Sequence, residues 1–120
     1  MLGKQPVLIV EDEFLIALEL ASEVEAMDGC VVGPAASVAD AIAILDQQPV
    51  SAAILDANLT DRDVTPLAIA LAELGVPFVV HSAVGIPHEL TLALPDVPFV
   101  AKPASARAVI ARLISRMTGQ

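Results

Sequence analysis

Short apolar runs alternate with amphipathic helical segments along the chain, and this alternation most constrains its fold. The first run, residues 6–10, reads Pro-Val-Leu-Ile-Val and is rich in β-branched side chains. That composition is typical of a strand buried on both faces. In residues 14–27, Ile16, Leu20 and Val24 recur with helical spacing and predict one buried helix face. The first unit is therefore a strand followed by a helix.

The same unit recurs along the rest of the chain. Further strands are predicted at residues 31–32, 52–55, 77–80 and 97–100. Further helices are predicted from Ser37 as N-cap to about Gln47, from Thr65 as N-cap to just before Gly75, and from about Ser105 to Met117. Residues 84–96 include Pro87 and Pro95, which predict a short or irregular fourth helix.

Strands that alternate with helices pair in parallel, because each crossover helix packs back on the sheet with the usual right hand. We therefore predict an α/β fold: a flavodoxin-like, doubly wound five-stranded parallel sheet in the order 2-1-3-4-5. The 120 residues fit one domain over residues 1–120, with its core at about 6–117.

Composition excludes several classes of protein. The formal net charge of −9 argues against nucleic-acid binding, which needs clustered Lys and Arg. No stretch approaches the roughly 20 apolar residues of a membrane helix, and residues 1–5 contain no secretory signal, so we expect a cytoplasmic protein without membrane insertion. The single cysteine, Cys30, cannot form an internal disulfide and is expected to be a small buried side chain.

Polar side chains gather where the predicted strands end. These side chains are Glu11, Asp12 and Glu13 after the first strand, Asp56 and Asn58 after the third, Ser82 after the fourth, and Lys102 after the fifth. In an open parallel sheet, ligands bind beyond the carboxyl ends of the strands, where the strand order reverses. The first and third strands are neighbours in the predicted order, so their acids should converge.

Converging carboxylates repel one another unless a cation joins them, and Mg²⁺ prefers such oxygen ligands. Lys102 can pair with the free Asp56 carboxylate, and with a phosphoryl oxygen once Asp56 carries a phosphoryl group. Ser82 offers a hydroxyl donor at the same place. Taken singly, the acids fit a helix first turn or a strand-end turn, and Lys102 fits a surface lysine. Their convergence favours a phosphoryl-transfer site with Asp56 as the nucleophile.

Four segments carry a family resemblance: Val-Leu-Ile-Val-Glu-Asp-Glu at 7–13, Ala-Ile-Leu-Asp-Ala-Asn-Leu at 53–59, Val-Val-His-Ser-Ala at 79–83, and Phe-Val-Ala-Lys-Pro at 99–103. As an ordered set they resemble the CheY-like response-regulator receiver domains of two-component signalling, in a single-domain form. The resemblance covers residues 7 to about 117. It implies a phosphoacceptor switch rather than a classical enzyme.

The resemblance also implies residue roles. Asp56 would accept a phosphoryl group from a sensor histidine kinase or a histidine phosphotransfer protein, in a phosphorelay. Glu11, Asp12, Asp56 and the backbone carbonyl of Asn58 would hold Mg²⁺. Ser82 would be the switch hydroxyl, Ala83 would leave access to it open, Lys102 would contact the phosphoryl group, and Phe99 would be the switch aromatic. The Lys102–Pro103 bond would be cis.

Three departures from the family pattern stand out. The loop at 59–63 lacks the frequent Pro and Gly, and Phe99 lacks the hydroxyl of the common Tyr, which excludes a tyrosine hydrogen bond from the switch. The third departure is the Pro-containing segment at 84–96, where the family places its output face.

On the first helix, Phe14 and Leu18 form a second apolar side, which we interpret as a docking surface for the kinase or phosphotransfer helix. Output would follow through protein–protein contact or onward phosphotransfer, and a homodimer is compatible with the sequence.

Two alternatives remain at the level of sequence. The first is a receiver-fold binding module that works without phosphorylation. The second is a haloacid-dehalogenase-like phosphatase, whose nucleophile loop has some likeness to Asp56–Thr60 but normally follows the first strand of a longer chain.

Overall fold

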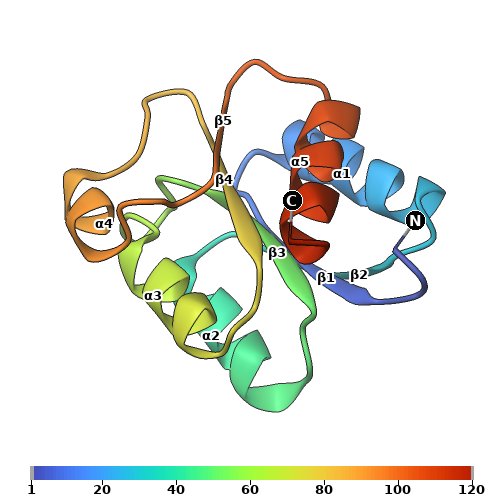
Figure 1. The fold of residues 1–120 in the computed structure, drawn as a ribbon, viewed down its shortest axis with the longest axis horizontal. Helices are drawn as coiled ribbons and strands as arrows, with labels where there is room; N and C mark the ends of the chain where they lie inside the picture. Colours follow the sequence, from blue (N-terminus) through green and yellow to red (C-terminus); the bar gives the residue numbers. More distant parts are fainter. Residues whose placement is uncertain (1, 120) are drawn as a thin grey trace.

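A five-stranded parallel sheet in the order β2-β1-β3-β4-β5 forms the centre of the computed structural model, which describes residues 2–119 (Figure 1). The strands are β1 (Pro6–Val10), β2 (Cys30–Ala35), β3 (Ala52–Asp56), β4 (Phe78–Ser82) and β5 (Phe99–Ala101). The helices are α1 (Phe14–Ala26), α2 (Val38–Gln47), α3 (Thr65–Glu73), α4 (His88–Ala93) and α5 (Ala106–Met117). The flavodoxin-like fold and its strand order are confirmed.

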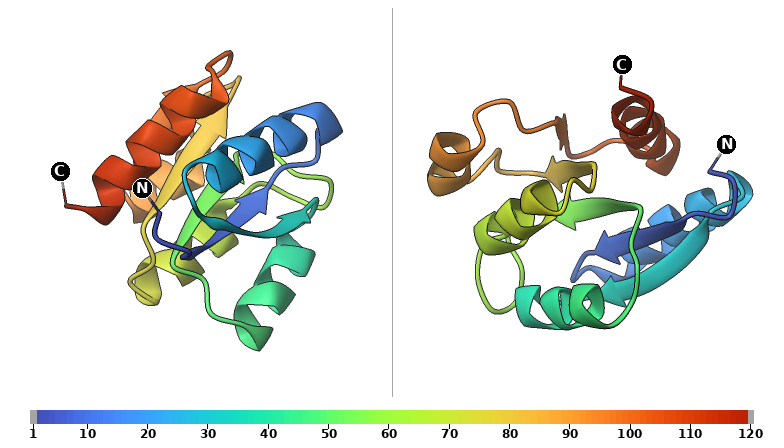
Figure 2. Two further views of the ribbon diagram at one scale, coloured as in Figure 1. Left: turned by 90° about the vertical axis from the view of Figure 1, so that its right-hand side faces the viewer. Right: turned by 60° about the horizontal axis from the view of Figure 1, so that its bottom comes forward.

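Two apolar layers cover the sheet because side chains alternate along each strand. Ile9, Ile54 and Val79 are buried on the face packed against α1 and α5. The neighbouring residues on each strand, such as Leu55 and Val80, point to the other face and are buried against α2 and α3. The two views of Figure 2 show α1 and α5 on one side of the sheet, with α2 and α3 on the other. Each strand therefore presents alternate residues to one helix layer.

Helix starts are mostly as predicted. The hydroxyls of Ser37 and Ser105 accept the backbone N–H groups three residues on, at the starts of α2 and α5. The prediction of Thr65 as the N-cap of α3 is wrong, since the N-cap is Val64. The carboxylate of Asp63 accepts the Thr65 N–H at 2.8 Å, so a side chain outside the helix satisfies its first donor.

The prediction that Cys30 is buried is also wrong, because its side chain is exposed. Cys30 is the first residue of β2, which lies at the edge of the sheet and pairs only with β1. An edge position has fewer neighbours to cover a side chain.

The fourth helix is short, as predicted. It spans His88–Ala93, and Leu90 is its buried residue. The segment before it, residues 83–87, has no regular structure. Among residues 2–119, no helix combines the length and the apolar character that crossing a membrane needs.

Candidate functional site

One row of side chains lies at the carboxyl ends of four strands. The core residues Ile9, Ile54, Val79 and Val100, one from each of these strands, all face α1 and α5. Side chains alternate along a strand, so the residue two positions after each of them faces the same way. We call these four residues the strand-end row: Glu11, Asp56, His81 and Lys102. Residue pairing supports it, since Asp56 is opposite His81 and the Lys102 N–H bonds the Ser82 carbonyl. The sheet register thus brings four distant segments together.

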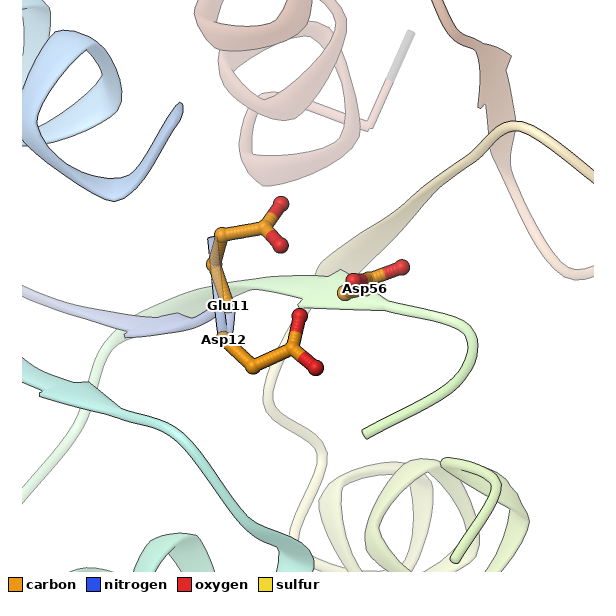
Figure 3. A group of neighbouring side chains, drawn as sticks. All are labelled: Glu11, Asp12 and Asp56. Atoms are coloured by element: carbon orange, nitrogen blue, oxygen red, sulfur yellow. The ribbon is translucent and has the colours of Figure 1, made fainter. Parts of the chain in front are cut away.

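Three carboxyl groups meet at the ends of β1 and β3 (Figure 3). Glu11, Asp12 and Asp56 each offer a carboxylate oxygen, and these oxygens lie within 4.8 Å of one another. Glu11 and Asp56 are only 4% and 8% exposed, whereas Asp12 is exposed. The Glu13 N–H donates to Glu11 Oε2 at 3.2 Å. The site therefore has a buried pair of acids with one open side.

Lys102 supplies the positive charge of the site. Its ammonium nitrogen lies 3.1 Å from Glu11 Oε1, 3.6 Å from Asp56 Oδ2 and 3.9 Å from Glu13 Oε1. Burial lowers the pKa of Lys102, but its hydrogen bond to Glu11 and the surrounding negative charges raise that pKa above its usual value. Lys102 is therefore a protonated donor at neutral pH.

This one ammonium does not balance the carboxylates. Burial raises the pKa of Glu11 to about 7, and the adjacent Asp56 carboxyl group adds to the rise, although Lys102 opposes it. The clustered oxygens are hard donors of the kind that Mg²⁺ prefers. The residues present thus fit a divalent cation, which would relieve their repulsion.

The loop after Asp56 is anchored to the start of α2. The Asp61 carboxylate accepts the N–H groups of Val38 and Ala39 at 2.9 and 3.0 Å, and the Thr60 hydroxyl donates to the Ala36 carbonyl at 3.0 Å. These amide hydrogen bonds lower the pKa of Asp61. Sequence reasoning missed this anchor, because its partners lie more than 20 residues apart.

Asn58 is exposed two residues after Asp56 and forms an isolated antiparallel bridge with Asp63. The Leu59 N–H also bonds the Arg62 carbonyl, so the loop closes on itself without the Pro and Gly that the family pattern often has. The loop holds the Asn58 backbone at the same end of the sheet as Asp56.

Ser82 ends β4 and is 1% exposed, and its hydroxyl oxygen accepts the Val84 N–H at 3.2 Å. Ala83, the next residue, is exposed. Phe99 is half-buried on the opposite face of the sheet, in register with Val80. The Lys102–Pro103 peptide bond is cis.

The outer side of α1 carries an exposed apolar patch near the same end of the sheet. Phe14 and Leu18 are 76% and 51% exposed, and Leu15, which sequence reasoning did not single out, is 70% exposed. We call these three residues the α1 patch.

Sequence reasoning also missed His81. His81 follows three apolar residues of β4 and precedes Ser82. Only its place in the sheet reveals which side chains lie beside it. The structure puts it in the strand-end row beside Asp56.

Comparison with solved structures identifies the family. No protein-family model matches the chain, and no curated protein sequence matches it. Among solved structures, SdrG from Sphingomonas melonis Fr1 is 33% identical, with a TM-score of 0.80 over 98% of this chain and 99% of that one. The CheY-like receiver domain protein from Methanospirillum hungatei JF-1 is 18% identical, with a TM-score of 0.84 over 96% of this chain and 94% of that one.

The non-phosphorylated HemR receiver domain from Leptospira biflexa is 22% identical, with a TM-score of 0.81 over 96% of this chain and 95% of that one. The structures from Methanospirillum hungatei and Leptospira biflexa are receiver domains. The chain belongs to the CheY-like response-regulator receiver domains.

Proposed function

We propose that this domain is a phosphoacceptor switch in which Asp56 takes a phosphoryl group in a Mg²⁺-dependent reaction. The observation that carries the proposal is the meeting of Asp56, two further acids and the Lys102 ammonium at the carboxyl ends of β1, β3 and β5. Receiver-domain neighbours over nearly the whole chain support a signalling domain rather than a classical enzyme.

Glu11, Asp12 and Asp56, with the backbone carbonyl of Asn58, are the groups that would hold Mg²⁺. When bound, the ion supplies positive charge where phosphoryl oxygens gather negative charge. The open side at Asp12 leaves room for water and a phosphoryl oxygen. The proposed domain extends over residues 1–120.

The chemical step needs little beyond positioning. A carboxylate oxygen of Asp56 attacks phosphorus and forms a P–O bond, while the bond from phosphorus to the donor histidine nitrogen breaks and its electron pair stays on that nitrogen. The Lys102 ammonium, already 3.6 Å from Asp56, then pairs with a phosphoryl oxygen. Lys102 thereby stabilises the transferred charge.

Switching follows from the new acceptor. The Ser82 hydroxyl now accepts from Val84, and we propose that it turns to donate to the phosphoryl group, which the exposed Ala83 leaves accessible. Loss of the Val84 contact would release the loop before α4, and the half-buried Phe99 would move with it. This would change the surface near α4 and β5.

The proposed partners are a sensor histidine kinase or a histidine phosphotransfer protein upstream. The α1 patch supports docking of an apolar helix beside Asp56, since it is exposed and adjoins the acidic end of the sheet. Downstream, the domain would act by protein–protein contact or by passing the phosphoryl group onward, in the cytoplasm, as a monomer or a homodimer.

Phosphorylation is tested by intact-mass measurement after incubation with acetyl phosphate, with and without Mg²⁺, beside Asp56→Asn. We expect one added phosphoryl group in the wild type only, and only with Mg²⁺. If neither an adduct nor beryllofluoride binding is detected, the proposal fails and a phosphorylation-independent binding module becomes the better hypothesis.

A further inference from the structure

His81 is a buried polar residue with unmet hydrogen-bonding capacity. Its side chain is 4% exposed, and within residues 2–119 neither ring nitrogen has a hydrogen-bond partner. Buried polar groups in proteins are nearly always paired, because an unpaired one loses its bonds to water without replacement. His81 therefore needs an explanation beyond packing.

The place of His81 is between the two main charges of the site. Asp56 is its register partner on β3, and Lys102 follows β5 on its other side. Neighbouring strands lie about 4.8 Å apart, so the Lys102 side chain must cross the end of β4 to approach Asp56. On this face, the last residue of β4 is His81.

His81 and Lys102 also share a cavity. A pocket of about 300 Å³ between α1 and the segment at 102–106 is lined by both residues, together with Ile16, Leu20 and Glu19 from α1. The pocket leaves open space beside the imidazole and the lysine side chain. The ring and the lysine stem thus adjoin where movement is sterically open.

The imidazole can serve as an acceptor. Burial lowers the pKa of His81, and the charge of Lys102 lowers it further, against a smaller opposing effect of Asp56. The ring is therefore neutral at pH 7 and has one acceptor nitrogen and one N–H donor.

At rest, the Lys102 ammonium has carboxylates as partners and does not need the ring: Glu11, Asp56 and Glu13. Phosphorylation with Mg²⁺ would change this, because the cation would occupy Glu11 and the phosphoryl group would cover the Asp56 oxygen. One ammonium N–H would then turn to a phosphoryl oxygen, and another would lose its acceptor.

We propose that His81 is a positioning residue for Lys102, whose ring nitrogen accepts an N–H of the ammonium in the phosphorylated state and holds that ammonium against the phosphoryl group. This inference rests on the proposed phosphoacceptor function. It explains why the ring nitrogens lack partners in the unphosphorylated structure: their partner is still engaged with Glu11.

The test compares His81→Leu, which removes both nitrogens at similar volume, with His81→Gln, which keeps a hydrogen-bonding end. Titration of the Mg²⁺-loaded protein with beryllofluoride should give a Kd about tenfold weaker for His81→Leu and within about threefold of wild type for His81→Gln. The apo His81→Leu variant should have a Tm higher by about 4 °C, because unpaired buried nitrogens are removed. A rise in Tm together with a loss of affinity is not expected of a packing role.

Val79→Ala is the matched control, since Val79 lies on the same strand and face and is fully buried. It should lower Tm and leave the beryllofluoride Kd unchanged. Equal Kd values for His81→Leu and wild type would overturn the inference.

A measurement on the wild type does not depend on the variants folding. The ¹⁵N shifts of the His81 ring, assigned with His88→Gln because the chain has two histidines, should move in the direction of an accepted hydrogen bond when beryllofluoride and Mg²⁺ are added. If the protein binds beryllofluoride and these shifts stay constant, the role of His81 is wrong while the phosphoacceptor function stands. If the wild type binds no beryllofluoride, the proposed function itself fails.

Discussion

The Lys102 ammonium nitrogen lies closer to a carboxylate oxygen of Glu11, at 3.1 Å, than to one of Asp56, at 3.6 Å. The shortest ion pair of the site is therefore made with an acid that also belongs to the candidate cation site. Lys102 and a divalent cation would compete for the same carboxylate.

Removing the competing charge should strengthen cation binding. We expect Lys102→Gln to bind Mg²⁺ about three- to tenfold more tightly than wild type, because a unit charge about 4 Å away is worth about 1 kcal/mol or more. The chain has no Trp or Tyr, so calorimetry suits the titration better than intrinsic fluorescence. An unchanged or weaker Mg²⁺ affinity would show that Lys102 does not compete for Glu11.

Glu11 should make stability depend on pH. Its pKa is raised from an ordinary 4.5 to about 7, so between these values the folded state binds more protons than the unfolded state. Stability should therefore fall as pH rises through this window, by an amount on the order of 3 kcal/mol.

Urea unfolding followed by circular dichroism, in EDTA at pH values from about 4.5 to about 8, measures this loss. Glu11→Gln should flatten the dependence, and saturating Mg²⁺ should reduce it, because the ion favours the charged carboxylate. An equal fall in the stability of both proteins would contradict the assignment to Glu11, and a rise with pH in the wild type would contradict the raised pKa.

Asp61 should fix the loop after Asp56 in place. In Asp61→Asn the charge that accepts the Val38 and Ala39 N–H groups is lost, so hydrogen exchange at these two amides should accelerate several-fold and Tm should fall. Asp46→Asn, an exposed acid at the other end of α2, is the control and should change neither.

The lowered pKa of Asp61 also gives a sign for acid conditions. The stabilisation by Asp61 should be complete above its ordinary pKa and should be lost as pH falls through the lowered value. If the protection of the Val38 and Ala39 amides against hydrogen exchange, relative to the intrinsic rate at each pH, is unchanged in acid, the anchor contributes nothing in solution.

The α1 patch should matter for protein donors and not for small ones. We expect Leu18→Lys to slow phosphotransfer from a phosphorylated histidine protein at least about tenfold, because it places a charge in an apolar contact. Labelling by acetyl phosphate should keep its wild-type rate. Leu74→Lys, at an exposed leucine at the end of α3, is the control. Equal losses with both donors would place the defect at Asp56 rather than in docking.

Much of the fold was predictable from the sequence, because the βα alternation determines parallel pairing and short β-branched runs locate the strands. The convergence of Glu11, Asp12 and Asp56 followed from the same reasoning, since neighbouring strands end at one edge. The carboxyl ends of buried strands are the positions where residue type and topology together carry information.

What the sequence did not reveal depends on contacts between distant segments. The hydrogen bonds of Asp61 to α2 bridge more than 20 residues, and nothing local marks Asp61 as a helix anchor. The exposure of Cys30 depends on β2 being an edge strand. That the His81 ring nitrogens have no hydrogen-bond partner within residues 2–119 depends on which side chains surround the ring in the folded chain. Local pattern does not report such tertiary placements.

The strand-end row has a consequence for how the sequence can vary. Each of its members faces α1 and α5 only because it lies two positions after a core residue of a strand, with one residue between them. Deleting one residue within any of these strands would turn that member to the opposite face while leaving its chemistry intact. A change of length within a strand would therefore abolish the proposed phosphoryl transfer whatever its effect on stability, whereas a change of length in the loops would be tolerable.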